Sequence, residues 1–245
     1  MEKEVSIIIP TKDALPLIKQ CLLSIQRNTV GMDYEVIVVD NASKDGTTEF
    51  VTGSELTLDG KYIRNKENKS FSVANNQGVS IAKGNYLCFL NNDTLVTRNW
   101  LVNMLKVFKE EDNIGIVGAR LVHPGRGTIQ HAGVIETASG LPDHIYFNKP
   151  MNYPPAMERK DYFAVTGACM LMPKKLFDDL GGFDETYWYG WEDIDMANKV
   201  KELGKRIVYE PTAVVYHYES RTSGRYLAES SNFGYYMKKW VLNKA

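Results

Sequence analysis

Three polar residues, Asn91, Asn92 and Asp93, directly follow the apolar run YLCFL. A short continuous apolar run predicts a buried strand, so these side chains stand at a strand end. Capping the next helix would require one such residue, whereas three follow one another here. We therefore interpret the triplet as a candidate binding site.

The acidic pair Glu192 and Asp193 is a second candidate for chemistry, because it follows an aromatic cluster. The cluster consists of Tyr187, Trp188, Tyr189 and Trp191. Aromatic faces beside carboxylates suit a sugar, which has an apolar CH face and a hydroxyl edge. Two structural interpretations stay open. The acids can stabilise the first turn of a helix through its dipole, and Trp188 and Trp191 can close the core.

The first two apolar runs, VSIIIP and EVIVVD, also end in residues that can contact a ligand. The first leads to Pro10 and Thr11, and the second ends at Asp40. The carboxyl ends of parallel strands meet at one edge of a sheet, where ligands bind. We therefore expect these residues to lie near Asn92. Asp40 taken alone is equally typical of a helix N-cap.

These candidates stand within an alternation of apolar runs and amphipathic helices. Strands are expected at residues 5–10, 35–40, 61–65, 86–90 and 114–122, and helices at 17–25, 71–82 and 100–108. Such an alternation is typical of a parallel sheet that is covered on both faces. The predicted fold class is α/β with a doubly wound sheet. The 245 residues are enough for one large domain.

The second half of the sequence is less regular. Residues 123–155 are rich in Gly, Pro and His and predict loops and a hairpin. His123, His131 and His144 have no partner at metal-ligand spacing, so we expect surface or loop roles for them. Gly167, after Thr166 in an apolar run, indicates a bulge or a close backbone approach. Further helices are expected after Pro173 and after Trp191. His217 ends the last apolar run, where a histidine bonded to backbone is one interpretation.

The C-terminal tail contains Phe233, Met237 and Trp240 at helical spacing. The first interpretation is a helix that docks on the domain. The alternatives are a homodimer contact, a peripheral membrane contact, or a lid whose Arg225 or Lys238 reaches a diphosphate.

Composition excludes several classes of protein. A net charge of −1 and a pI of about 6.4 argue against a nucleic-acid partner. Three cysteines, Cys21, Cys88 and Cys169, include no CxxC pair and predict reduced core thiols. No run approaches the ~18 apolar residues that span a membrane, and the N-terminal apolar run is too short for a signal peptide. We expect a cytoplasmic protein, with the inner face of the membrane as an alternative location.

Taken in order, these stretches resemble the family 2 glycosyltransferases, which are inverting enzymes with the GT-A fold. The matching stretches are VSIIIPTKD, YEVIVVDNASKDGT, ENKSFSVANNQG, FLNNDT, TGACMLMPKKLFDDLGGFDE, WEDIDMANKVKELGKRIVYEP and VVYH. Within the family, the bacterial rhamnosyltransferase-like branch is the most similar. The resemblance implies a Rossmann-like, mostly parallel central sheet with helices on both faces and a smaller acceptor-side region. It divides the chain into a nucleotide-sugar-binding half (1–122), an acceptor-binding and catalytic half (123–217) and a C-terminal helical tail (218–245).

The resemblance also implies roles for individual residues. Asp193 would be the general base, and Glu192 would orient the acceptor or the base. Asp93 and His217 would hold a divalent cation, Mn²⁺ or Mg²⁺. The donor-binding residues would be Pro10, Thr11, Asp40, Asn68, Asn76, Asn91, Asn92 and Asp93, and the acceptor side would use Gly167, Trp188 and Trp191. Asn76 is equally typical of an amide that packs a helix. The family often has Asp where this chain has Asn91 and Asn92, and often Gly where it has Ser70.

The implied activity is metal-dependent, inverting transfer of a sugar from a nucleotide-diphosphate donor to a hydroxyl group of a glycan. A UDP-sugar is favoured over a dTDP-sugar or a GDP-sugar. The acceptor would be a lipid-linked or protein-linked glycan in bacterial cell-surface polysaccharide or glycoprotein synthesis. The alternative is a non-catalytic module that binds a nucleotide or a sugar on the same scaffold. An NAD-dependent oxidoreductase is disfavoured because no GxGxxG follows a strand. The chain also lacks the arginine-bearing, glycine-rich loop of a nucleotidylyltransferase and the membrane helices of a processive synthase.

Overall fold

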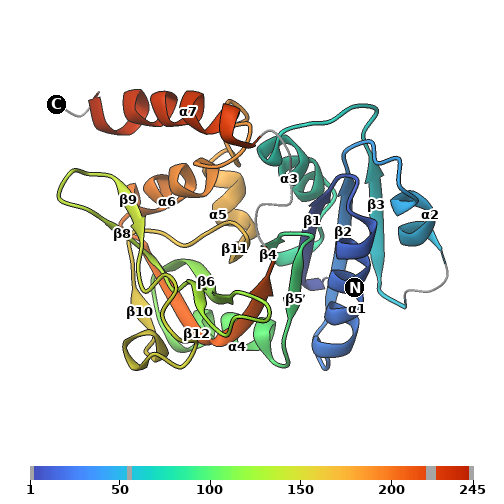
Figure 1. The fold of residues 1–245 in the computed structure, drawn as a ribbon, viewed down its shortest axis with the longest axis horizontal. Helices are drawn as coiled ribbons and strands as arrows, with labels where there is room; N and C mark the ends of the chain where they lie inside the picture. Colours follow the sequence, from blue (N-terminus) through green and yellow to red (C-terminus); the bar gives the residue numbers. More distant parts are fainter. Residues whose placement is uncertain (1–2, 54–56, 219–224, 243–245) are drawn as a thin grey trace.

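The computed structural model describes residues 3–53, 57–218 and 225–242, and side chains are described for all of these except 225–230. Figure 1 shows the elements in chain order. They are β1 (Lys3–Thr11), α1 (Leu15–Asn28), β2 (Tyr34–Asp40), α2 (Thr47–Thr52), β3 (Gly60–Arg64), α3 (Phe71–Ser80), β4 (Gly84–Leu90), β5 (Thr94–Val96), α4 (Trp100–Glu110), β6 (Ile114–Val122), β7 (Ile129–His131), β8 (Val134–Glu136), β9 (Pro142–His144), η1 (Pro154–Met157), β10 (Lys160–Asp161), β11 (Cys169–Pro173), α5 (Lys174–Asp179), α6 (Glu192–Glu202), β12 (Arg206–His217), α7 (Arg225–Tyr236) and a π-helical turn, η2 (Met237–Val241).

A ten-stranded sheet forms the centre of the molecule, in the order β10-β12-β6-β11-β4-β1-β2-β3, with β5 paired to β12 and β7 to β6. The strands β3, β2, β1 and β4 are all parallel to one another. Strand β11 runs antiparallel between β4 and β6. The predicted α/β class and central sheet are confirmed, and the reversed β11 joins the two halves of the chain into one sheet.

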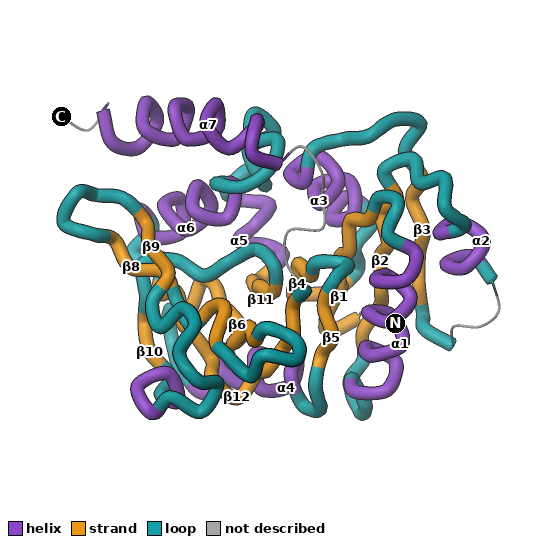
Figure 2. The backbone as a smooth tube through the Cα atoms, in the orientation of Figure 1, coloured by secondary structure: helices purple, strands orange, loops and turns teal. Residues whose placement is uncertain are grey.

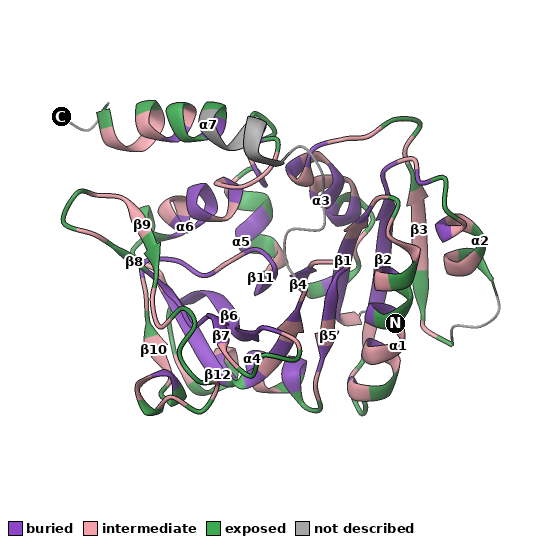
Figure 3. Ribbon diagram, in the orientation of Figure 1, coloured by how far each residue is buried: buried purple, intermediate pink, exposed green. Residues whose placement is uncertain are grey.

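Alternating side chains of each strand build a core on both faces of the sheet. Ile7 and Ile9 of β1 pack with apolar residues of α1 and α4 on one face. Ile8 points to the other face, where it packs with residues of α3, α5 and α6. Because both faces are covered, most residues of the central strands are buried, as Figure 3 shows in purple. This two-faced burial explains why the strands read as continuous apolar runs in the sequence.

The C-terminal segment lies beside α6, along the upper side of the molecule in Figures 1 and 2. Tyr236 is 2% exposed and belongs to the same core cluster as α6. Trp240 and Lys239 reach Asp195 of α6, at 2.7 Å each from its Oδ1 atom. The expected docking of the tail on the domain is therefore confirmed for residues 231–242. The Arg225 side chain, which one alternative placed in a lid, falls outside the described residues.

Some boundaries differ from the predictions for local physical reasons. The helix after the Asn91 triplet begins at Trp100, as predicted, but residues 94–96 before it form the short strand β5, which was not predicted. Helix α2 was not predicted, since six residues are too few to show helical periodicity. The last two apolar runs are one strand, β12, with a register shift between Glu210 and Val214.

The three cysteines are buried and unpaired, which confirms the predicted core thiols. Within the described residues, no helix combines the length and the apolar composition that crossing a membrane requires.

Candidate active site

A cavity of about 410 Å³ joins the two halves of the chain at the carboxyl ends of β1 and β4. Nine of the fourteen predicted site residues line it. They are Pro10, Thr11, Asn91, Asn92, Asp93, Gly167, Glu192, Asp193 and His217. The first five come from strand ends of the first half, and the other four come from the second half. The sheet edge therefore brings together residues that are far apart in the sequence, since 207 positions separate Pro10 from His217.

Asp93 and His217 form a close pair at the floor of this cavity. Strand β5 pairs antiparallel with the end of β12, with Thr94 opposite His217. The backbone N–H of Tyr218 also donates to the Asp93 carbonyl at 3.0 Å. This pairing holds the His217 Nε2 atom 3.0 Å from the Asp93 Oδ1 atom, and both residues are buried.

Gln130 fixes the tautomer of His217. Its Oε1 atom lies 2.7 Å from the His217 Nδ1 atom. Since an amide oxygen carries no proton, the Nδ1–H of His217 donates to it, and Nε2 is the nitrogen that faces Asp93. The Asn91 Nδ2 atom donates toward the same Nε2 at 3.2 Å. The Nε2 atom and a carboxylate oxygen thus face each other, a pair that can hold a divalent cation in place of a proton, and metal-binding histidines typically donate their other N–H in this way.

These two residues are the protein's own contribution to such a site. The described part of the chain contains no group of three or more His, Cys, Asp or Glu residues arranged to hold a metal. Mg²⁺ and Mn²⁺ at phosphate sites take several ligands from phosphate and water. The residues present therefore fit a cation that is shared with a bound diphosphate.

Asn92 and Thr11 connect the two strand ends that border the cavity. The Asn92 Nδ2 atom donates to the Thr11 Oγ1 atom at 2.8 Å. The next residue, Lys12, is the only lysine or arginine among the described residues that line the cavity. Its Nζ atom lies 3.1 Å from the Asp13 Oδ2 atom. Lys12 was not among the predicted site residues, although it follows a strand end and places a positive charge beside the cavity.

Asp193 stands in the first turn of α6 and has both oxygens held by backbone. Its Oδ2 atom accepts from the Gly167 N–H at 2.8 Å, and its Oδ1 atom accepts from the Ile194 N–H at 2.8 Å. The residue before the pair, Trp191, has a φ of 78°, which a bulky side chain rarely adopts. The turn thereby directs Glu192 and Asp193 into the cavity lining.

Asp40 does not line the cavity. It is fully buried, and its carboxylate accepts from the Ser43 N–H and Arg64 Nη1, each at 2.8 Å, and from Tyr62. In this geometry Asp40 organises the loop that brings Asn41 to the cavity. Its assignment to the nucleotide base stays a prediction.

Asn68 and Asn76 also lie outside the cavity lining. Asn76 brackets the turn after α5. Its Nδ2 atom donates to the Phe183 carbonyl at 2.9 Å, and its Oδ1 atom accepts from the Phe183 N–H at 3.1 Å. The Asn68 Oδ1 atom is buried and has no hydrogen-bond partner among the described residues. Donor contacts by Asn68 and Asn76 stay predictions.

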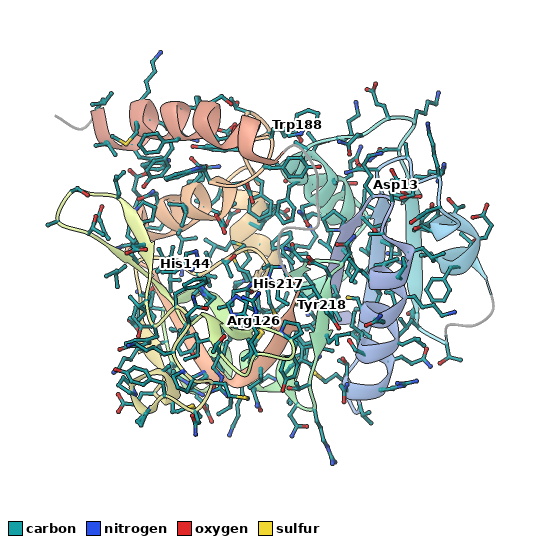
Figure 4. All side chains as sticks on the ribbon, viewed as in Figure 1. Asp13, Arg126, His144, Trp188, His217 and Tyr218 are labelled. Carbon is teal, nitrogen blue, oxygen red and sulfur yellow. The ribbon has the colours of Figure 1, made fainter. Side chains whose placement is uncertain are left out.

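The two predicted acceptor tryptophans do not line the cavity. Trp191 packs against Phe233 and Tyr236 of α7, with ring centroids 5.3 and 4.7 Å apart. Trp188 is 44% exposed, and Figure 4 shows it at the upper side of the molecule. In contrast, Tyr189 and Gly190 between them do line the cavity. Acceptor binding by Trp188 and Trp191 stays a prediction.

The expectation of a surface or loop role is wrong for His131, which is buried in strand β7, whereas His144 is exposed, as expected. Both line the cavity, and their Nδ1 atoms lie 3.0 Å apart. Gln130, which was also not predicted, comes from the same short strand, β7. The sequence could not pair these residues because their partners stand 13 and 87 positions away.

Comparison with known proteins decides the family. The profile described as glycosyl transferase family 2 matches residues 6–181. The chain belongs to this family. A second profile, described as the N-terminal domain of galactosyltransferase, matches residues 152–221. The family membership that the motifs predicted is thus confirmed, and the chain is a glycosyltransferase domain.

The curated relatives are much longer proteins. One is an uncharacterized protein, y4gI, of Sinorhizobium fredii, 34% identical over 90% of this chain and 25% of its own length. Another is the O-antigen biosynthesis protein RfbC of Myxococcus xanthus, 29% identical over 89% of this chain and 17% of its own length. The family 2 domain described here thus spans a quarter or less of these two relatives. A shorter match, 36% identical over 25% of this chain and 20% of the relative, is an N-acetylglucosaminyl-diphospho-decaprenol L-rhamnosyltransferase of Mycobacterium tuberculosis.

Solved structures confirm the GT-A fold. GalNAc-T7, crystallised with UDP, GalNAc and Mn²⁺, has a TM-score of 0.72 and 17% identity, over 88% of this chain and 43% of that one. The mannosyltransferase PcManGT of Pyrobaculum calidifontis, in complex with GDP-Man and Mn²⁺, has a TM-score of 0.70 and 20% identity, over 97% of this chain and 65% of that one. At such identities the likeness concerns the fold.

Proposed function

We propose that this family 2 domain transfers a sugar from a nucleoside-diphosphate donor to a hydroxyl group, with inversion at the anomeric carbon. One observation carries the proposal: the pair Asp93 and His217, suited to a shared cation, lines the same cavity as the carboxylate of Asp193. Sugar transfer needs a cation beside the leaving diphosphate and a proton acceptor beside the attacking hydroxyl group, on opposite sides of the anomeric carbon.

The nucleotide is proposed to lie against the ends of β1, β2 and β4. Thr11, Asn41 and Asn92 line this side of the cavity, and Lys12 supplies a positive charge near a phosphate group. Asp93 and His217 would hold Mn²⁺ or Mg²⁺ together with diphosphate oxygens. The cation would neutralise the charge that develops on the leaving group. We favour a UDP-sugar, with a dTDP-sugar second, although the structural neighbours include complexes of both UDP and GDP-Man.

Asp193 is proposed to accept the proton of the acceptor hydroxyl group. The hydroxyl oxygen forms a bond to the anomeric carbon as the bond between that carbon and the diphosphate oxygen breaks. The bonding electron pair leaves with the diphosphate, and the proton goes to Asp193. Because the backbone N–H groups of Gly167 and Ile194 fix both carboxylate oxygens, Asp193 is held in place for this transfer. A single displacement of this kind inverts the configuration.

The acceptor is proposed to be a lipid-linked or protein-linked glycan of a bacterial cell surface. The relative from Myxococcus xanthus, an O-antigen biosynthesis protein, supports a polysaccharide. The three buried thiols support a reducing compartment, so we propose a cytoplasmic location. Contact with the inner membrane face and a homodimer through the tail stay predictions.

Turnover of nucleotide sugars tests this proposal. The chain is incubated with UDP-, dTDP- and GDP-sugars, with p-nitrophenyl glycosides as hydroxyl acceptors, in Mn²⁺ and in EDTA. We expect release of one nucleotide in Mn²⁺ only, and a product whose anomeric NMR coupling is inverted relative to the donor. Binding of a nucleotide without any release would instead support the non-catalytic module. A product that retains the donor configuration would contradict the single displacement.

A further inference from the structure

A pair of histidines lies on the side of the cavity that the predicted site left unassigned. The Nδ1 atoms of His131 and His144 are 3.0 Å apart, and their rings cross at 80°. His131 is 1% exposed, whereas His144 is exposed, and both line the cavity. In Figure 4, His217 lies between Asp13 on one side and His144 on the other. His144 and the proposed cation pair therefore line the same cavity.

The backbone around this pair is closely constrained. His144 of β9 pairs with Val134 of β8. The Val134 N–H in turn donates to the Ala164 carbonyl at 2.9 Å, two residues before Thr166. Gly133 has a φ of +118°, and a Cβ atom there would lie 2.3 Å from the Tyr162 ring. Only glycine fits this position, so the close approach of Tyr162 fixes the backbone just before β8.

Hydrogen bonds determine which nitrogen of each ring carries the proton. The backbone N–H of Thr166 donates to the His131 Nε2 atom at 3.4 Å. Nε2 must therefore be unprotonated, and the proton of a neutral His131 is on Nδ1. That N–H donates to the His144 Nδ1 atom, which accepts it. The proton of His144 is consequently on Nε2, where it can donate to a group in the cavity.

The burial of His131 supports this arrangement. Burial lowers the pKa of His131 well below its usual value, and positive charge on His144 or His217 would lower this pKa further. His131 thus stays neutral near pH 7 and keeps one donor and one acceptor nitrogen. In this neutral form, His131 accepts from the Thr166 N–H and donates to His144, so the position of its proton determines the tautomer of His144.

The neighbouring surface suits a sugar. Phe147 also lines the cavity and is 49% exposed, three residues after His144. An aromatic face can cover the CH face of a sugar, while the His144 Nε2–H can donate to a hydroxyl oxygen. We propose that His144 binds a sugar hydroxyl group through its Nε2–H, and that His131 is the positioning residue that keeps the proton on this nitrogen. This inference rests on the proposed function, and the hydroxyl group belongs to the donor sugar or to the acceptor glycan.

Binding measurements separate the two sources of the hydroxyl group. The wild type is first titrated with the nucleotide alone and with the matching nucleotide sugar. In His144→Phe we expect an unchanged Kd for the nucleotide. If His144 contacts a hydroxyl group of the donor sugar, the variant should bind the nucleotide sugar about 5- to 100-fold more weakly than the wild type does. A hydroxyl group on the acceptor would instead raise the KM of the p-nitrophenyl glycoside by a similar factor and leave donor hydrolysis by water unchanged.

Conservative variants distinguish hydrogen bonding from a structural role. His144→Gln keeps an N–H near the position of Nε2 and should recover most of the lost affinity. His131→Asn keeps a donor near Nδ1 and should behave like the wild type, whereas His131→Leu should behave like His144→Phe. Asp143→Asn, an exposed change on the same strand, serves as the matched control. The inference would be overturned if His144→Phe binds the nucleotide normally and leaves both the Kd for the nucleotide sugar and the KM for the p-nitrophenyl glycoside unchanged. A wild type that binds no nucleotide would instead refute the proposed function, and this inference with it.

The tautomers can be measured without any ligand. Nitrogen-15 NMR of labelled imidazoles should show the Nδ1–H form of His131 and the Nε2–H form of His144 at pH 7. His131→Leu should convert His144 to a mixture of tautomers, and His131→Asn should not. An Nδ1–H form of His144 in the wild type would contradict the proposed positioning.

Discussion

At the scale of single residues, the function of the site depends on which lone pairs and protons face the cavity. Backbone N–H groups hold both oxygens of Asp193, and Gln130 holds the N–H of His217. Neither side chain needs to reorganise when a ligand arrives, and such preorganisation is a main source of catalytic power. The account therefore makes separate predictions for the base and for the cation pair.

Asp193→Asn should remove the proton acceptor and keep the shape of the turn. We expect kcat to fall by about 10²- to 10⁴-fold, because that is the usual contribution of general base catalysis. The Kd for the nucleotide should stay unchanged. Asp179→Asn, an exposed acid on α5, is the matched control. Near-normal turnover in Asp193→Asn would exclude Asp193 as the base.

Gln130→Leu should remove the hydrogen bond that keeps the proton of His217 on Nδ1, while both cation ligands stay in place. We expect the nucleotide affinity measured in Mn²⁺ to fall by about 10- to 100-fold, which is typical for an outer partner of a metal-binding histidine. The affinity in EDTA should not change. Gln130→Glu keeps an oxygen acceptor and should recover the Mn²⁺-dependent binding. Equal affinities in wild type and Gln130→Leu would remove the cation role from His217.

At the scale of elements, the C-terminal segment supports the turn that carries the acids. Asn232 of α7 donates to the carbonyls of Tyr189 and Gly190, at 2.8 and 3.2 Å. Rings of the same helix pack on Trp191, whose positive φ is a conformation that costs about 1–3 kcal/mol. The tail thus holds a strained residue directly before Glu192.

Lys239 connects this tail to two acids on the domain. Its Nζ atom lies 2.7 Å from Asp195 Oδ1, which is buried, and 2.7 Å from Asp184 Oδ2. Lys239→Met should lower the free energy of unfolding by about 1–3 kcal/mol, because a buried carboxylate loses a charged partner. Lys238→Met, an exposed neighbour, should leave stability within about 0.5 kcal/mol. Urea denaturation of the two variants tests this, and equal stabilities would show that the tail docks without the ion pair.

Sequence patterns predicted those elements whose residues face a core and those site residues that stand at strand ends. Asp93 and Asp193 follow directly from local context, since each is polar beside an apolar element. Lys239 and Asp195 are different, because 44 residues separate them and no local pattern links them. Gln130 and His131 were missed for the same reason, as their roles depend on partners from other strands. Strand β5 has only three residues, too few for a periodic signal, yet it places Asp93 beside His217.

At the scale of the whole molecule, stability should depend on pH through groups whose pKa differs between the folded and unfolded chain. His131 has a lowered pKa when folded, so the unfolded chain binds its proton first as pH falls below about 6.5. Stability is therefore full above that pH and declines below it. Burial alone would raise the pKa of Asp184, but hydrogen bonds, chiefly from Lys239, outweigh it and lower this pKa. Asp184 thus adds a second loss of stability as pH falls below about 4.

His131→Asn should remove the first of these two phases. In the wild type we expect a loss approaching about 1.4 kcal/mol per pH unit below pH 6.5, which is the limit for one extra proton. Between pH 7 and pH 5.5 the variant should lose less stability than the wild type, and it should keep the acid phase near pH 4. Urea denaturation across this range measures both slopes. Parallel profiles for the two proteins would show that His131 titrates normally in the folded state.

The central claim is that one cavity binds a nucleotide together with a cation held by Asp93 and His217. Calorimetric titration with UDP, dTDP and GDP, each in Mn²⁺ and in EDTA, tests it most directly. The account predicts that one nucleotide binds in Mn²⁺, and that EDTA or Asp93→Ala weakens this binding at least about tenfold, as for removal of a metal ligand. Equal binding in Mn²⁺ and EDTA, or no binding of any of the three nucleotides, would contradict it.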